Sequence, residues 1–141
     1  MPLSAYRDQT YFKLYMTDIG LLRRMARLPA AAILDNSSLY REFKGALTEN
    51  YVLCELVNQY DDSPYYWKSG NRAEVDFIVQ NHMDIVPIEV KSGRSERARS
   101  LSEYRKKYAP PKWLVTSMKN AGGSHIPLYM LWQIKKILNH R

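Results

Sequence analysis

The chain has 141 residues, 45% hydrophobic and 25% charged, a composition that is typical of a globular protein with one hydrophobic core. Lys and Arg outnumber Asp and Glu by 21 to 14, which gives a formal net charge of +7 and favours a polyanionic partner such as nucleic acid, although a hydrated basic surface explains it equally well. The single cysteine, Cys54, excludes a disulfide framework within the chain. With no apolar run near the roughly 20 residues of a transmembrane helix and no signal peptide, we expect a cytoplasmic location.

The N-terminal region, residues 1–36, predicts a short strand followed by a short helix. Residues 11–16 are rich in aromatic side chains, as strands often are. Asp18 is a suitable cap for a helix whose apolar residues recur at helical spacing, and Pro29 stops that helix. Residues 37–141 are expected to form the α/β domain proper.

The longest predicted helix spans about residues 39–59, with Ser38 as its cap. Glu49 lies on or beside its apolar stripe, so a helix crossing a sheet can bring this carboxylate to the sheet surface. The stripe consists of Leu39, Phe43, Ala46, Leu47, Tyr51, Cys54 and Val57.

Three strands are predicted next, and helical and strand patterns then alternate to the end. Ser100 and Glu103 have the spacing of a capping box, which begins a helix through about Tyr108. This order of elements predicts an α/β fold in which helices flank a mixed sheet. The strands are expected at 65–68, 73–80, 85–91 and 112–117, and the last helix at about 127–138.

An acidic cluster is predicted where the second and third strands pair. Side chains two apart on a strand share a face, so Glu89 and Lys91 are expected side by side, with Asp76 near them in a hairpin. In the second strand, strict alternation places Val75 on the opposite face from Asp76. Gathering such charges is unfavourable unless they serve a cation or a reaction. The alternative for Glu89 and Lys91 is an exposed salt bridge.

This cluster has the chemistry of a metal-dependent phosphodiesterase. Mg²⁺, or Mn²⁺ in its place, prefers hard oxygen ligands at about 2.1 Å and keeps several waters. We expect Glu49, Asp76 and Glu89 to bind the metal. Lys91 would orient the attacking water or stabilise negative charge in the transition state, so Asp76, Glu89 and Lys91 are the candidate catalytic residues.

Asp76 followed by Glu89-Val90-Lys91, with an upstream helical glutamate, resembles the PD-(D/E)XK nuclease superfamily. The resemblance implies a restriction-endonuclease-like core of helix, three strands, helix, strand. It places the helical acid of that superfamily on Glu49, the acid of its second strand on Asp76 and the pair of its third strand on Glu89 and Lys91. Tyr104 stands where related nucleases often carry a helical Tyr.

A second resemblance covers nearly the whole chain from about residue 10. The chain is similar to an uncharacterised domain family that typically forms the C-terminal domain of bacterial and archaeal AAA-type ATPases. This implies an N-terminal ATPase module as partner, with residues 1–36 as the remnant of the junction to it. The motifs are Lys13-Leu-Tyr-Met-Thr-Asp-Ile-Gly-Leu-Leu22, Gly45-Ala-Leu-Thr-Glu-Asn-Tyr-Val52, Tyr66-Trp-Lys68, Glu74-Val-Asp-Phe-Ile78 and Pro87-Ile-Glu-Val-Lys-Ser-Gly93.

The chain itself has no Gly-x-x-x-x-Gly-Lys phosphate loop, so no ATP site is expected in it. Arg94, Arg97 and Arg99 follow the acidic cluster and predict contacts with nucleic-acid phosphates, with a solvated loop as the alternative. The first hypothesis is a Mg²⁺-dependent nuclease-like domain that hydrolyses phosphodiester bonds in nucleic acid. The alternative is a non-catalytic nucleic-acid or protein-binding module that accompanies the ATPase.

Overall fold

The centre of the molecule is a five-stranded sheet with the strands in chain order from one edge to the other. The computed structural model describes residues 2–29, 31, 41–70, 73–93 and 98–140. The first three strands pair antiparallel and the last three parallel, so the sheet is mixed, as predicted. The strands are β1 (Tyr65–Ser69), β2 (Ala73–Asn81), β3 (Asp84–Val90), β4 (Leu114–Ser117) and β5 (His125–Pro127).

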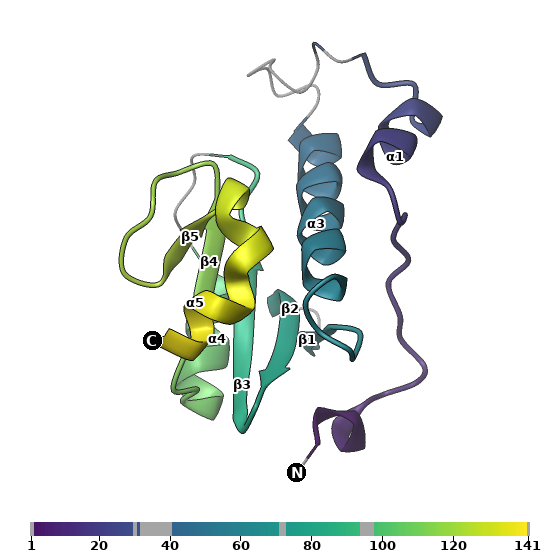
Figure 1. Ribbon diagram of the computed structural model, residues 1–141. Coiled ribbons are helices and arrows are strands. Elements are labelled where there is room, and N and C mark those ends of the chain that lie inside the picture. The colour runs from purple at the N-terminus through teal and green to yellow at the C-terminus, as the bar shows by residue number, and fades with distance from the viewer. Residues whose placement is uncertain (1, 30, 32–40, 71–72, 94–97, 141) are drawn as a thin grey trace.

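Helices cover both faces of this sheet (Figure 1). The main core lies between one face and α3 (Arg41–Val57), η3 (Leu128–Gln133) and α5 (Ile134–His140). On the other face, α4 (Arg99–Tyr108) packs over β2. Within the described part of the chain, no helix combines the length and apolar character needed to cross a bilayer. The main core consists of Val52, Leu56, Tyr60, Phe77, Val79, Val86, Ile88, Leu114, Ile126, Leu128, Leu131, Ile134 and Leu138.

The N-terminal region differs from the prediction in its first half. A short 3-10 turn, η1 (Leu3–Tyr6), is followed by extended chain that enters no ladder of the sheet, so the strand predicted at residues 11–16 is wrong. This extended segment, residues 7–18, runs beside α3 (Figure 1). The predicted helix is confirmed as α1 (Ile19–Met25), and the Asp18 carboxylate accepts a hydrogen bond from Leu21 N at 2.6 Å.

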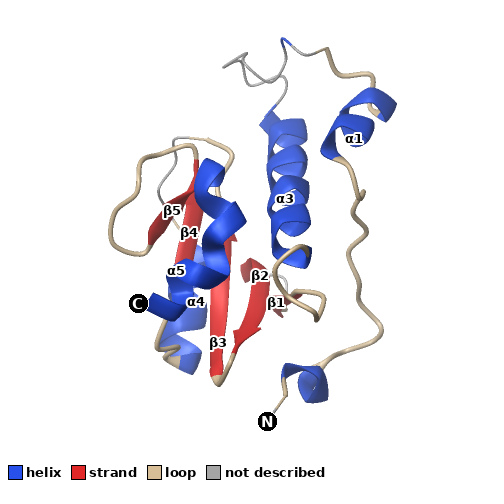
Figure 2. Ribbon diagram, in the orientation of Figure 1, coloured by secondary structure: helices blue, strands red, loops and turns tan. Residues whose placement is uncertain are grey.

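Two other element boundaries differ from the sequence prediction (Figure 2). The capping box is wrong, because α4 begins at Arg99 after Ala98 and Ser100 already lies inside the helix. The last segment contains the short strand β5 and the 3-10 helix η3 before α5 begins. A three-residue strand carries too little alternation to be recognised. The predicted Ser38 cap lies outside the described residues.

The second strand contains an irregularity beside Asp76. Tyr65 pairs with Ile78 and Trp67 with Val75, so β1 advances two residues while β2 advances three. The extra residue of β2 therefore lies between Val75 and Ile78, as in a β-bulge, which bends a strand and redirects its side chains.

The bulge changes which side chains share a face. Val75 and Ile78 both join the small cluster around Tyr104 on the α4 side, whereas Phe77 and Val79 join the main core. The strict alternation predicted for β2, with Val75 on the same face as Phe77 and Val79, is therefore wrong. The side-chain alternation of β2 is therefore interrupted at Asp76, and the contacts of Asp76 define its surroundings.

Candidate functional site

Glu89 and Lys91 form a close ion pair near the end of β3. Lys91 Nζ lies 2.6 Å from Glu89 Oε1, which confirms that the two side chains lie side by side. Glu89 is only 4% exposed, and its second oxygen, Oε2, is buried with no hydrogen-bond partner among the described residues. An exposed salt bridge does not describe this pair, because a buried carboxylate oxygen without a partner is unfavourable unless something else binds it.

Asp76 lies on β2 beside the same end of β3. Its Oδ2 accepts a hydrogen bond from the backbone amide of Val90 at 2.7 Å. Burial raises the pKa of Asp76 to about 7; the Val90 hydrogen bond and the charge of Lys13 oppose the rise, and the charges of Glu89 and Glu49 add to it. Asp76 therefore lies within electrostatic reach of both other predicted acids.

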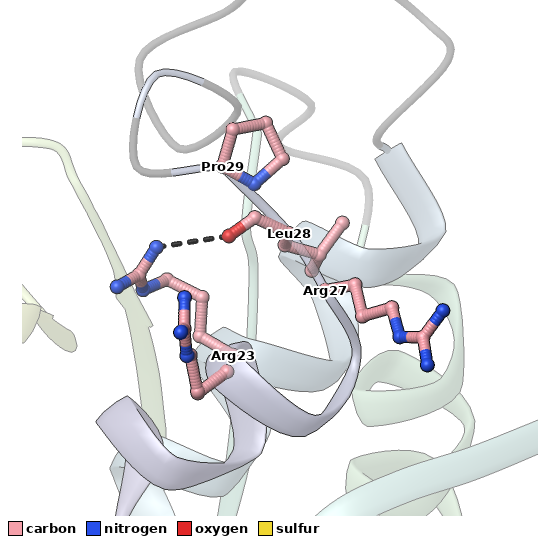
Figure 3. A pocket seen from close by; sticks show the side chains of 5 residues that line it. Arg23, Arg27, Leu28 and Pro29 are labelled. Carbon is pink, nitrogen blue, oxygen red and sulfur yellow. Dashed lines mark hydrogen bonds between the residues drawn. The ribbon is translucent and has the colours of Figure 1, made fainter.

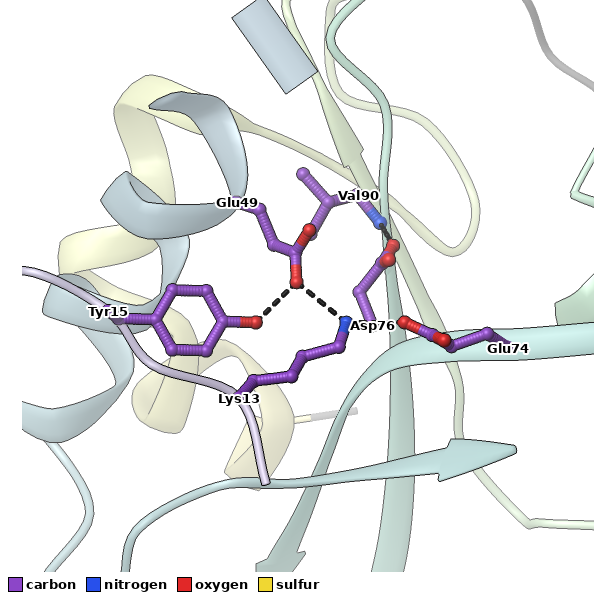
Figure 4. Close-up of polar contacts among 6 residues, drawn as sticks. All are labelled: Lys13, Tyr15, Glu49, Glu74, Asp76 and Val90. Carbon is purple, nitrogen blue, oxygen red and sulfur yellow. Dashed lines mark hydrogen bonds and ion pairs between the residues drawn. The ribbon is translucent and has the colours of Figure 1, made fainter. Parts of the chain in front are cut away.

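Glu49 projects from α3 toward this region, where two side chains of the N-terminal segment bind it (Figure 4). Its Oε1 accepts a hydrogen bond from the Tyr15 hydroxyl and another from Lys13 Nζ at 2.9 Å. Lys13 Nζ also lies 2.5 Å from Glu74 Oε1. Burial alone would lower the pKa of Lys13, but Glu74 and Glu49 outweigh it and raise that pKa, so the ammonium stays charged.

The N-terminal segment is fixed to α3 directly beside Glu49. Asn50, which is buried, accepts a hydrogen bond from Met16 N and donates one to Met16 O, both at 2.8 Å. The ring of Tyr15 packs on Phe77 of β2, with the centroids 5.9 Å apart. Lys13 and Tyr15 therefore belong to the site, although the sequence prediction did not include them. The sequence feature that could have indicated this attachment is Asn50, next to the helical acid Glu49. A buried amide side chain requires polar partners, and here another segment of the chain provides them.

The chemistry of a hard cation fits part of this arrangement. Among the described residues, no three His, Cys, Asp or Glu side chains are grouped so that they could hold a metal ion. Asp76 and Glu89 nevertheless offer two carboxylates on neighbouring strands, and Glu89 Oε2 has no partner in the described part of the chain. Mg²⁺ in proteins is often bound by one or two carboxylates together with waters and substrate phosphates. Glu49, the predicted third ligand, is instead held by Lys13 and Tyr15.

The predicted basic contacts are only partly described. Arg94 and Arg97 lie outside the described residues, and Arg99 begins α4. Tyr104 packs edge-on against Trp67, with a centroid distance of 5.2 Å, and belongs to the small cluster under α4. Its contacts are therefore those of a packing residue.

A different basic group surrounds a hollow at the end of α1 (Figure 3). Arg23 Nη1 donates to Leu28 O at 2.9 Å, which fixes one guanidinium at the rim. Arg24 and Arg27 are exposed, and within the described part of the chain neither forms an ion pair. The labelled Arg23 and Arg27 point to different sides in Figure 3, so the group suits an extended anion better than a single small one.

Fold and site together define an α/β protein with a buried acidic site on a mixed sheet. The chain matches, over residues 44–130, the family model described as a domain of unknown function, DUF4143. Because the match covers more than half of the chain, the protein belongs to this family. The matched range includes Glu49, Asp76, Glu89 and Lys91, whereas Lys13 precedes it. No curated protein and no solved structure matches the chain.

Proposed function

We propose that this domain hydrolyses phosphodiester bonds in nucleic acid with the help of Mg²⁺ or Mn²⁺, as the nuclease-like C-terminal part of an AAA-type ATPase. The observation that carries the proposal is the pair of carboxylates on β2 and β3, of which Glu89 is buried and Asp76 is partly buried. Burial raises the pKa of Asp76 to about 7, and Glu89 Oε2, beside the Lys91 ammonium, has no partner among the described residues. A divalent cation would satisfy both carboxylates at once.

Each of these side chains has a defined part in the proposed reaction. Asp76 and Glu89 would bind the cation from the sheet, and Glu49 would bind it from α3. When bound, the cation polarises a phosphoryl oxygen and makes a bound water more acidic. Lys91, held by Glu89 at 2.6 Å, stabilises the negative charge that develops on the phosphate, because a preoriented ammonium is most effective where solvent is largely excluded.

The charge of the chain supports a polyanionic substrate. The formal net charge is +7, and Arg24 and Arg27, which form no ion pair among the described residues, can contact successive phosphates beside the α1 hollow. Further phosphate contacts would come from Arg94, Arg97 and Arg99, which follow Lys91 in the sequence. The sequence resemblance is the only support for an accompanying ATPase module.

One observation favours a second candidate, a non-catalytic nucleic-acid or protein-binding module. Lys13 already neutralises Glu49 and Glu74, and three acids are not grouped for a metal within the described residues. In that case the acidic side chains would serve only the stability of the fold, and binding of a partner would not depend on a divalent cation.

A cleavage assay separates the two candidates. End-labelled duplex DNA, single-stranded DNA and RNA are incubated with the protein in Mg²⁺ or in EDTA. We expect cutting of at least one substrate in Mg²⁺, none in EDTA, and none with Asp76→Asn or Glu89→Gln. Asp62→Asn, at an exposed position in a turn, is the matched control and should cut normally. Binding in EDTA without cutting under any condition would support the binding module instead.

A further inference from the structure

The ammonium of Lys13 lies between two carboxylates from different elements (Figure 4). It is 2.9 Å from Glu49 Oε1 on α3 and 2.5 Å from Glu74 Oε1 on β2. The Lys13 side chain is about one-quarter exposed. Because Glu49 and Lys13 both act on the charge of Asp76, this ammonium lies within electrostatic reach of the proposed cation position.

The contacts of Lys13 are more specific than those of a surface ion pair. The same Glu49 oxygen that accepts from Lys13 also accepts from Tyr15, and Asn50 fixes the intervening backbone to α3. An exposed ion pair needs none of this support and typically contributes little to stability. The N-terminal segment therefore delivers a positive charge to one defined place, next to the acids of the site.

We propose that Lys13 is a further functional lysine of this site, one that exchanges partners when a divalent cation binds. Without the cation, Lys13 holds Glu49 near Asp76. A cation that takes Glu49 as a ligand displaces the ammonium, which Glu74 then retains beside the site, where it contacts a phosphate of the substrate. This inference rests on the proposed function, because it requires a cation at the acids and a phosphate-bearing substrate.

The proposal predicts two effects of opposite sign for one substitution. Removing the Lys13 ammonium removes a positive charge that competes with the cation, so cation affinity rises. The same substitution removes a group that neutralises the substrate phosphate, so turnover falls. A residue that only maintained the structure would lower both quantities when replaced.

Titration with Mn²⁺, followed by electron paramagnetic resonance, measures the first effect on the intact chain. We expect Lys13→Gln to bind Mn²⁺ about tenfold more tightly than the native protein. Lys13→Arg, which keeps the charge, should stay within about twofold. Lys68→Gln removes an exposed charge opposite Glu74 in the sheet register and is the matched control; it should leave the affinity unchanged.

The outcomes distinguish this proposal from the proposed function. If the native protein binds Mn²⁺ and cuts nucleic acid, but Lys13→Gln binds Mn²⁺ equally or more weakly, the role of Lys13 is wrong and the nuclease proposal stands. If Lys13→Gln binds Mn²⁺ and the native protein does not, competition by Lys13 is supported. If neither binds Mn²⁺, both proposals fail. Thermal unfolding of each variant verifies that the compared proteins are folded.

Discussion

Asp76 accepts a hydrogen bond from the backbone amide of Val90 at 2.7 Å, just beyond Phe77–Ile88, the last β2–β3 register pair at this end. The Asp76 carboxylate thus accepts the hydrogen bond from Val90 N that a backbone carbonyl of β2 would accept if the ladder continued. Because Val90 lies between Glu89 and Lys91, this contact fixes Asp76 beside the other two candidate catalytic residues.

The partly buried Asp76 makes the stability of the protein depend on pH. Its pKa is about 7 in the fold and near 3.8 in the unfolded chain, so the folded state binds more protons between these values. Stability is therefore greatest below pH 3.8 as far as this group is concerned, falls as pH rises toward 7, and stays low above it. We expect Asp76→Asn to have a higher free energy of unfolding than the native protein at pH 8, by an amount on the order of 3 kcal/mol, and therefore a higher unfolding temperature.

Thermal unfolding in EDTA at pH 5 and pH 8 checks this expectation. The difference between the native protein and Asp76→Asn isolates the carboxyl group, because other acids contribute equally to both. The stability gain of the variant should be larger at pH 8 than at pH 5. An equal difference at the two pH values would show that Asp76 does not titrate in this range.

The pair of Glu89 and Lys91 should show strong energetic coupling. Lys91→Met leaves a buried carboxylate without its partner and should lower the free energy of unfolding by roughly 3 kcal/mol at pH 8. Glu89→Gln in the same chain should recover much of that loss, because no buried charge then remains. Urea unfolding of the native protein, both single variants and the double variant measures the coupling. Additive losses would contradict a buried, interacting pair.

The attachment of the N-terminal segment depends on Asn50. Both polar atoms of its side chain bind the backbone of Met16, so Asn50→Ala should lower the free energy of unfolding by about 1–3 kcal/mol. Hydrogen exchange at the Met16 amide should accelerate in the same variant. Asn58→Ala, at an exposed position after the same helix, is the control and should alter neither. Unchanged exchange at Met16 would mean that the segment is held by other contacts.

The arginines of α1 should contribute to nucleic-acid affinity through phosphates. We expect the double substitution Arg24→Gln and Arg27→Gln to reduce the slope of log K against log salt concentration by about 2 for a labelled duplex in EDTA. The control is Lys106→Gln with Lys136→Gln, which removes the same charge from two other exposed positions. Fluorescence anisotropy measures both. Equal changes of slope in the two double variants would show that only net charge matters.

Local patterns predicted most of the fold. The cap at Asp18 and the shared face of Val86 and Ile88 in β3 each depend on residues a few positions apart, and the structure agrees with them. The apolar stripe predicted for α3 is only partly right: Leu47 is buried, but Phe43 and Val57 are exposed. The buried Val52 and Leu56 lie outside that stripe. The side-by-side placement of Glu89 and Lys91 also followed from the period of a strand. These features are set by backbone geometry and local burial, which neighbouring residues determine.

Features that depend on distant contacts could not be predicted in this way. The bond from Lys13 to Glu49 joins residues 36 positions apart, and the bulge of β2 depends on its pairing with β1. The aromatic residues of the N-terminal segment resemble a strand, but here α3 rather than a strand provides the partners of that segment. Tertiary contacts therefore determined the conformation of the N-terminal segment and the bulge in β2, which local propensity does not specify.

The central claim is that a divalent cation joins Asp76 and Glu89, and a crystal structure grown with Mn²⁺ tests it most directly. The anomalous difference map should show a peak between the two carboxylates, near Glu49, and the peak should disappear in Glu89→Gln crystals grown in the same way. A map without a peak at this position, or coordinates in which Asp76 and Glu89 face opposite sides of the sheet, would contradict the claim.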